Sequence, residues 1–201
     1  MRPLLVATTS RHKLEEYRAL LAGLPFELHS LADAGIDEDV EETGETFEDN
    51  ARLKAARYCE LSGMLTLADD SGIEVDALSG EPGVHSKRWA GDVDDDERNR
   101  ILLERMRGVP EELRTARYRC AIALARPGRQ VVVVVGASEG RLLEAPVGTN
   151  GFGYDPLFYV PEIGQTFGEA APAVKNVLSH RGRAAQAAKA MLANWADLPR
   201  G

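Results

Sequence analysis

The first half of the chain alternates between short apolar runs and longer segments with helical spacing. Residues 2–7 predict a buried strand, and residues 13–21, with apolar positions three and four apart, predict a helix behind it. Shorter runs at 26–29 and 64–68 predict two more strands. Residues 46–61 predict a helix that begins with a capping box formed by Thr46 and Asp49. Strands and helices therefore alternate along this half.

The second half predicts more strands than helices. Residues 94–106 form an amphipathic helical pattern, whereas 118–125 and 130–137 predict two strands joined by an Arg-Pro-Gly-Arg turn, and therefore an antiparallel hairpin. The valine run within the second of these strands predicts burial on both faces. Further strands are expected at 142–145 and 157–160, and an Ala-rich helix at 183–195. The sum is an α/β fold, a mixed sheet flanked by helices, in one domain over residues 1–201.

Composition narrows the classes of partner. A net charge of −8 argues against nucleic acid, because polymer binding depends on many Lys and Arg contacts with phosphates. No apolar run approaches the roughly 20 residues that span a bilayer, so we expect no membrane association. The two cysteines, Cys59 and Cys120, lie far apart inside patterned segments. This spacing favours free thiols and a cytoplasmic protein over a disulfide framework or a zinc cluster.

A possible phosphate site lies at the first strand-to-helix turn, residues 8–13. Three hydroxyl side chains, the N–H groups of a starting helix and Lys13 could together hold an anion. An ordinary helix cap with a solvated lysine is the simpler interpretation of this turn alone. The glycine-rich spacing of a Walker A loop is absent.

Carboxylates gather at two places that could hold a metal ion. Glu42 precedes a predicted helix on which Asn50 and Lys54, four residues apart, share one face. Glu42 could bind magnesium and Lys54 could neutralise phosphate, or this face is merely solvated. Asp69 and Asp70 end a predicted strand, where α/β sheets place their ligands. Because neighbouring strand residues point to opposite faces, one would bind metal or activate water while the other braces the loop, unless both form an Asx turn.

The C-terminal third offers an aromatic ring and a group of donors. Glycines on both sides of Phe152 would let the backbone approach a ligand while the ring stacks, and Asp155 offers an acceptor; a plain tight turn is the alternative. Lys175, His180 and Arg181 cluster near the start of the last predicted helix. Donors there suit a phosphate or an oxygen-rich heterocycle, or form a basic surface cap.

The order of these motifs resembles the inosine triphosphate pyrophosphatase family, also called Ham1-like, over nearly the whole chain. The resemblance rests on residues 8–13, 42–44, 46–47, 50–54, 68–72, 82–86 with Arg88, 151–156 and 179–181. One position departs from the pattern, because Ser10 stands where the family usually has Asn. This substitution leaves the phosphate contact at that position open, although a hydroxyl can still donate to an anionic oxygen.

The resemblance implies a long mixed sheet with two lobes around a central cleft, and a homodimer. It implies Mg²⁺-dependent hydrolysis of non-standard purine nucleoside triphosphates (ITP, dITP and XTP) to the monophosphate and pyrophosphate. Asp70 as proton acceptor and Lys54 would be catalytic, and Glu42 and Asp70 would hold the metal. The substrate-binding set would be Thr8, Thr9, Ser10, Arg11, His12, Lys13, Ser71, Phe152, Gly153, Tyr154, Asp155, Lys175, His180 and Arg181.

The positions of hydrogen-bond donors and acceptors on the purine suggest how such a site selects its base. The 6-oxygen of hypoxanthine or xanthine accepts from donors such as Arg181, whereas the amino group of adenine would leave a donor unpaired at a cost of about 1 to 3 kcal/mol. Guanine shares the 6-oxygen, and no residue that rejects its 2-amino group is identified. Two rival functions are a nucleotide sensor without turnover and a haloacid dehalogenase-like phosphatase. The latter uses Asp-x-Asp, whereas Asp69 and Asp70 are adjacent.

Overall fold

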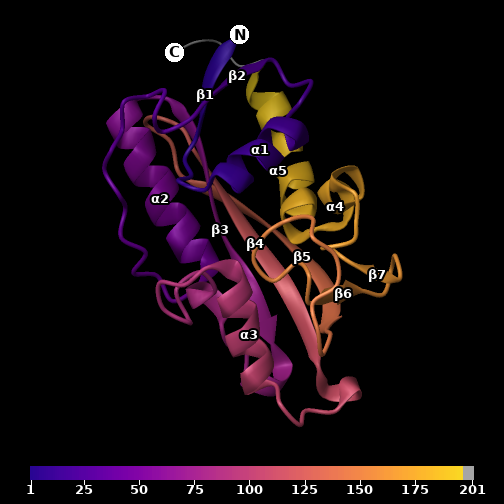
Figure 1. The fold of residues 1–201 in the computed structure, drawn as a ribbon. Helices are drawn as coiled ribbons and strands as arrows, with labels where there is room; N and C mark the ends of the chain where they lie inside the picture. The colour runs from indigo at the N-terminus through magenta and orange to yellow at the C-terminus, as the bar shows by residue number, and fades with distance from the viewer. Residues whose placement is uncertain (197–201) are drawn as a thin grey trace. The chain divides into compact units, whose positions relative to one another are not determined.

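The computed structural model describes residues 1–196, whose strands form one mixed seven-stranded sheet (Figure 1). Its order is β2-β1-β3-β4-β5-β6-β7. β1 pairs in parallel with β2 and β3, whereas β6 pairs antiparallel with β5 and β7, which confirms the predicted mixed sheet. The strands are β1 (Arg2–Val6), β2 (Phe26–His29), β3 (Leu65–Val75), β4 (Thr115–Ala125), β5 (Val132–Leu142), β6 (Phe158–Val160) and β7 (Gln165–Thr166).

Polar side chains cap the start of the first three helices. Ser10, Thr46 and Asp94 are the N-caps of the first three, and each side chain accepts a hydrogen bond from a backbone N–H in the first turn. The helices are α1 (Arg11–Leu20), α2 (Phe47–Ser62), α3 (Asp95–Arg105), α4 (Pro172–Leu178) and α5 (His180–Ala196), with single 3₁₀ turns at Asp76–Leu78, Gly83–His85 and Glu111–Leu113. Within residues 1–196, no helix combines the length and apolar character that crossing a membrane requires.

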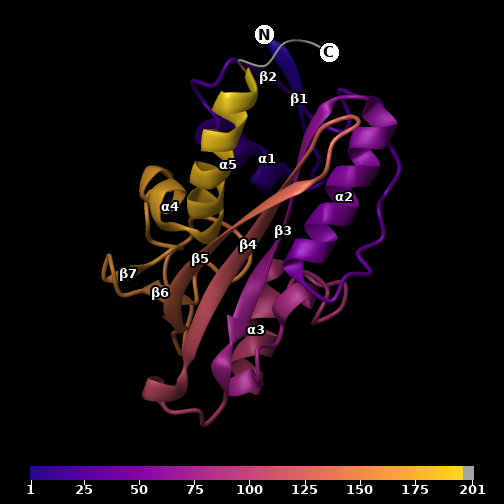
Figure 2. The same ribbon diagram turned by 180° about the vertical axis from the view of Figure 1, so that it is seen from behind.

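The chain divides into two compact units, each with its own apolar core. Unit 1 comprises residues 1–70, 120–136 and the described part of 181–201, and unit 2 comprises 71–119 and 137–180. In unit 1, α1 and α5 pack side by side on the core, and α2 lies on the opposite side of β3 (Figures 1 and 2). The expectation of one domain over residues 1–201 stays a prediction, and its last five residues lie outside the described part.

The core of each unit is made of buried side chains from several elements. The core of unit 1 includes Leu4, Val6, Tyr17, Leu67, Ile122, Leu124, Ala184, Ala188 and Leu192. The core of unit 2 includes Ile73, Val75, Leu102, Met106, Tyr118, Leu157, Phe158 and Phe167.

The strand predicted to end at residue 68 continues to Val75, so this boundary was wrong. Asp69 and Asp70 therefore lie within a strand, which excludes the Asx turn. The strand continues because Ile73 and Val75 are fully buried in the core of unit 2. The N–H of Ile73 also donates to Ser86 Oγ at 2.9 Å, which anchors this part of the strand.

The short link at 126–131 between neighbouring strands β4 and β5 fits the predicted antiparallel hairpin, because parallel strands need a longer crossover. Two other predictions for this region need correction. The separate strand predicted at 142–145 is absent, because the Arg114 guanidinium donates hydrogen bonds to the carbonyls of Leu142 and Leu143, both at 2.9 Å. The valine run is not covered on both faces: Val134 packs on the core, whereas Val135 is 53% exposed.

Two short elements were missed near the C-terminus. Neither β7 nor α4 has enough residues to show a periodic pattern, although Pro172 at the first turn of α4 is a typical helix start. The last helix begins at His180, three residues before the predicted start.

Candidate active site

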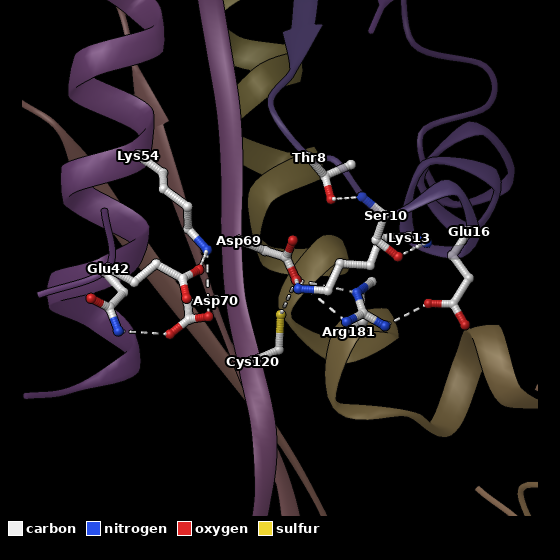
Figure 3. Close-up of polar contacts among 11 residues, drawn as sticks. Thr8, Ser10, Lys13, Glu16, Glu42, Lys54, Asp69, Asp70, Cys120 and Arg181 are labelled. Carbon is white, nitrogen blue, oxygen red and sulfur yellow. Dashed lines mark hydrogen bonds and ion pairs between the residues drawn. The ribbon is translucent and has the colours of Figure 1, made fainter. Parts of the chain in front are cut away.

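Asp69 and Asp70 lie on opposite sides of β3 in unit 1 (Figure 3). Both side chains are nearly sealed from solvent, with exposures of 1% and 8%. The alternation of a strand thus separates two neighbouring carboxylates into two different polar clusters, as the sequence predicted.

On one side of β3, the ammonium of Lys54 joins two carboxylates. Its Nζ lies 2.6 Å from Glu42 Oε1 and 3.4 Å from Asp70 Oδ1 (Figure 3). Lys54 and Asn50 project from the same face of α2, as their spacing predicted. The acidic segment before α2 and the strand β3 are therefore connected through this helix.

Asn50 is the second connection on this side, and it is fully buried. Its Nδ2 donates to Asp70 Oδ2 at 3.1 Å, and its Oδ1 accepts from the N–H of Gly44 at 2.7 Å. Gly44 permits this approach, because a Cβ there would lie 2.6 Å from Asp49 Cβ. The amide therefore fixes the orientation of the Asp70 carboxylate and the path of the preceding loop.

The surroundings move the pKa values of this pair in a definite direction. Burial raises the pKa of Asp70, and although the charge of Lys54 opposes this effect, Glu42 adds to it, so the net shift is upward. Burial alone would lower the pKa of Lys54, but the nearby carboxylates of Asp70, Asp69 and Glu42 raise it. Lys54 thus stays charged, while Asp70 holds a proton more strongly than an ordinary aspartate does.

On the other side of β3, Asp69 accepts from two cationic side chains. Its Oδ2 lies 3.0 Å from Lys13 Nζ and 3.3 Å from both Nε and Nη2 of Arg181. Arg181 Nη1 donates to Glu16 Oε2 at 2.6 Å (Figure 3). This cluster joins α1, β3 and α5 within unit 1.

The cations reverse the effect of burial on Asp69. Burial would raise its pKa, but the charges of Lys13, Arg181 and Lys54 together hold it well below the ordinary value. Cys120, whose Sγ lies 3.8 Å from Asp69 Oδ2, responds in the opposite way, because burial and the neighbouring carboxylate raise its pKa to about 12. Cys120 is therefore a protonated thiol and a poor nucleophile.

The turn at residues 8–13 has features of both an ordinary helix cap and an anion site. Ser10 is an ordinary cap, because its Oγ accepts from the N–H of Lys13 at 3.4 Å, while Thr8 Oγ1 accepts from the N–H of Ser10 at 3.1 Å. Lys13, however, is not a solvated lysine, since only 17% of its side chain is exposed and it pairs with Asp69. The remaining positions, Thr9, Arg11 and His12, are exposed.

In unit 2, Phe152, Asp155 and Lys175 form a compact group. Asp155 Oδ2 accepts from the N–H of Phe152 at 2.8 Å and from Lys175 Nζ at 2.7 Å. Lys175 Nζ lies 4.5 Å from the centre of the Phe152 ring, within the range of a cation–π contact. Gly151, with φ of 77°, leaves room for Asp155, whose Oδ2 would lie 2.1 Å from a Cβ at residue 151.

The other predicted positions of this region lie in different elements. Lys175 belongs to the separate helix α4, whereas His180 begins α5 and stacks on Tyr118, with ring centres 4.5 Å apart. Ser71 continues β3 beyond Asp70. Tyr154 is buried, and its hydroxyl donates to the carbonyl of Ser86 at 2.8 Å.

The contacts of Arg181 bear on its predicted role as a donor to the purine base. The Arg181 side chain is 1% exposed, and its three nitrogens have carboxylate partners. Reading of the purine 6-oxygen by this side chain stays a prediction. Glu16 was missed, although it lies one helical turn from Lys13, a spacing that places both on one face.

Comparison with known proteins identifies the group to which these features belong. Residues 4–191 match the Ham1 family. The chain is 50% identical over 185 residues to a dITP/XTP pyrophosphatase of Geobacter sulfurreducens, covering 92% of this chain and 93% of that protein. It is 52% identical over 184 residues to a dITP/XTP pyrophosphatase of Symbiobacterium thermophilum, covering 90% of each.

Solved structures agree with the sequence matches. A HAM1 protein from Coxiella burnetii superposes with a TM-score of 0.88 at 37% identity, covering 96% of this chain and all of that one. A nucleoside-triphosphatase, or dITP/XTP pyrophosphatase, from Mycobacterium abscessus gives a TM-score of 0.74 at 43% identity, with coverage of 92% and 98%. By sequence and by fold, the chain belongs to the Ham1 family.

Proposed function

We propose that this protein hydrolyses ITP, dITP and XTP to the monophosphate and pyrophosphate. The observation that carries the proposal is the cluster of Asp70, Lys54 and Glu42, in which a buried carboxylate with a raised pKa lies beside a charged ammonium group. The names of the relatives supply the substrate class, since those proteins are dITP/XTP pyrophosphatases.

Magnesium is the proposed cofactor, and the residues present suit it. Glu42 and Asp70 each direct one carboxylate oxygen toward a single positive charge, the Nζ of Lys54. Mg²⁺ in nucleotide enzymes is held by one or two carboxylates together with phosphate oxygens and water. Residues 1–196 contain no group of three or more His, Cys, Asp or Glu side chains that could hold a metal ion, so Glu42 and Asp70 would need phosphate and water to complete the site.

Hydrolysis requires a base, positive charges beside the phosphates, and a base that is held in a defined orientation. When bound, Mg²⁺ would offset the charge of the phosphates. Asp70 would take the proton of the attacking water, and its raised pKa makes its ionised form a stronger base than an ordinary aspartate. Asn50 holds Asp70 at one oxygen, and Lys54 and Lys13 would offset the charge that develops on the leaving pyrophosphate.

Recognition of the nucleoside is proposed for Ser71, residues 152–155, Lys175 and His180. The Phe152 ring offers a face for stacking, and Lys175 contacts the ring and Asp155 together. Arg181 would act on the substrate through Asp69 and Lys13, since its own nitrogens contact carboxylates.

The deciding experiment is a substrate profile in which pyrophosphate and orthophosphate are measured separately. ITP, dITP and XTP should release pyrophosphate in the presence of Mg²⁺, and ATP and GTP should react much more slowly. Chelation of the metal should abolish the reaction, and added Mg²⁺ should restore it. Tight binding of ITP without turnover would favour a nucleotide sensor, and release of orthophosphate would favour a phosphatase.

A homodimer in the cytoplasm completes the proposal. Both cysteines are free and buried, which suits a reducing compartment. The dimer rests on the family resemblance, and light scattering at several protein concentrations tests it directly.

A further inference from the structure

Helix α3 holds the backbone of Gly153 at both of its polar groups. The N–H of Gly153 donates to Asp95 Oδ2 at 2.6 Å, and its carbonyl accepts from Asn99 Nδ2 at 2.9 Å. Asp95 and Asn99 are four residues apart, so they lie on one face of the helix. Neither residue was identified from the sequence, and all three belong to unit 2.

The residues around Gly153 are fixed as well. Asp155 accepts from the N–H of Phe152, and the Tyr154 hydroxyl donates to the carbonyl of Ser86. Each of residues 152–155 therefore has a defined polar contact inside unit 2. The Phe152 ring is carried by a stretch of backbone whose shape is set before any ligand binds.

Asp95 and Asn99 form a clamp on Gly153, and Arg98 holds this clamp in place. Arg98, between the two clamping residues in sequence, pairs with Asp95 Oδ1 and donates to the carbonyl of Val93 at 2.8 Å. Asn99 is only 5% exposed, and its Oδ1 has no hydrogen-bond partner among the described residues. Because a buried acceptor without a partner destabilises a fold, stability alone does not account for an asparagine at this position.

We propose that Asp95 and Asn99 are positioning residues that set the loop 151–155 in its purine-binding shape. The inference rests on the proposed role of this loop in nucleoside recognition. A loop that is already ordered loses little conformational entropy on binding. If the clamp is broken, only a fraction of molecules has the competent loop, and the apparent affinity falls by that fraction. The chemical step should change little, since Asp70 and Lys54 are untouched.

The test compares Asp95→Ala and Asn99→Asp with the control Asp96→Ala. Asp96 is exposed and lies in the same first helical turn, so the control removes an equal charge from α3 without touching Gly153. Asn99→Asp keeps the shape of the side chain, but an ionised carboxylate there cannot donate to the Gly153 carbonyl. Three quantities are measured: KM and kcat for ITP, the Kd of a non-hydrolysable ITP analogue, and the inhibition constant of tripolyphosphate, which has no base.

Both clamp variants should raise KM and the analogue Kd by about tenfold or more, because each loses a hydrogen bond that involves a charge or a buried amide. The kcat should stay within about threefold of wild type. The tripolyphosphate constant and the Asp96→Ala control should stay near wild type. This pattern separates positioning of the base-binding loop from a general loss of structure.

Two results would overturn the inference: an unchanged KM and Kd in both clamp variants, or a loss in which the tripolyphosphate constant changes in parallel. The hydrolysis proposal fails separately, if the wild-type protein binds the analogue but releases no pyrophosphate. The Kd comparison still tests the clamp in that case.

Discussion

Asp69 and Asp70 are the same residue type, adjacent in one strand and almost equally buried, yet the fold shifts their pKa values in opposite directions. Asp69 lies among the cationic groups of Lys13 and Arg181, so it is ionised very readily. Asp70 shares one lysine with Glu42 and keeps a proton more strongly. The comparison teaches that burial alone does not decide the protonation state of a carboxylate: at Asp70 burial outweighs the charge of Lys54, whereas at Asp69 the cationic neighbours outweigh burial.

The sharpest way to test the comparison is to replace Asp70 with Asn. If Asp70 is the base, turnover of ITP should fall by about 10²- to 10⁴-fold, while the fold stays intact because an amide fits the same space. Steady-state pyrophosphate release and far-ultraviolet circular dichroism measure the two effects. Near-normal turnover in this variant would remove the assignment of Asp70 as the base.

Replacement of Asp69 with Asn should act mainly on stability. Arg181 would stay buried with one carboxylate partner fewer, and loss of one member of a buried ion pair costs about 3 to 5 kcal/mol. Chemical denaturation at neutral pH measures the change. A loss below about 1 kcal/mol would contradict the role of Asp69 as the partner of these cations.

The pH dependence of that loss follows from the sign of the shift. The folded protein lowers the pKa of Asp69, so the ionised carboxylate contributes stability above its ordinary value of 3.8, and this contribution is lost as the pH falls below that value. The difference between wild type and Asp69→Asn should therefore be full at neutral pH and shrink in acid.

The smallest expected effect is a gain of stability in Asp70→Asn without metal. The folded protein raises the pKa of Asp70, so the wild type loses stability as the pH rises from 3.8 through the folded-state value. The variant lacks this loss, and its melting temperature in chelator at neutral pH should be higher by a few degrees at most. The gain should disappear in acid. An equal gain at both pH values would point to a cause other than ionisation.

The sequence predicted much of this arrangement because local patterns carry it. The face shared by Asn50 and Lys54 follows from helical spacing, and the separation of Asp69 from Asp70 follows from strand alternation. The sheet with its flanking helices follows from alternating apolar runs.

Other features could not be predicted from the sequence, because they depend on contacts between segments that are distant along the chain. The pairing of Arg181 with Glu16 joins residues 165 positions apart, and no spacing rule connects them. The clamp of Asn99 on Gly153 spans 54 positions. The extension of β3 past Asp70 depends on burial of Ile73 in a core built from later segments. The first two contacts change the roles given to side chains that the motifs identified.

The link between Glu16 and Arg181 has a consequence for synthesis of the protein on the ribosome. Unit 1 draws on the first residues of the chain and on its last helix, and Ala184, Ala188 and Leu192 fill its core. A nascent chain that stops short of residue 181 lacks both the guanidinium that neutralises Asp69 and this apolar surface. Emergence of α5 is thus the event that completes the core of unit 1.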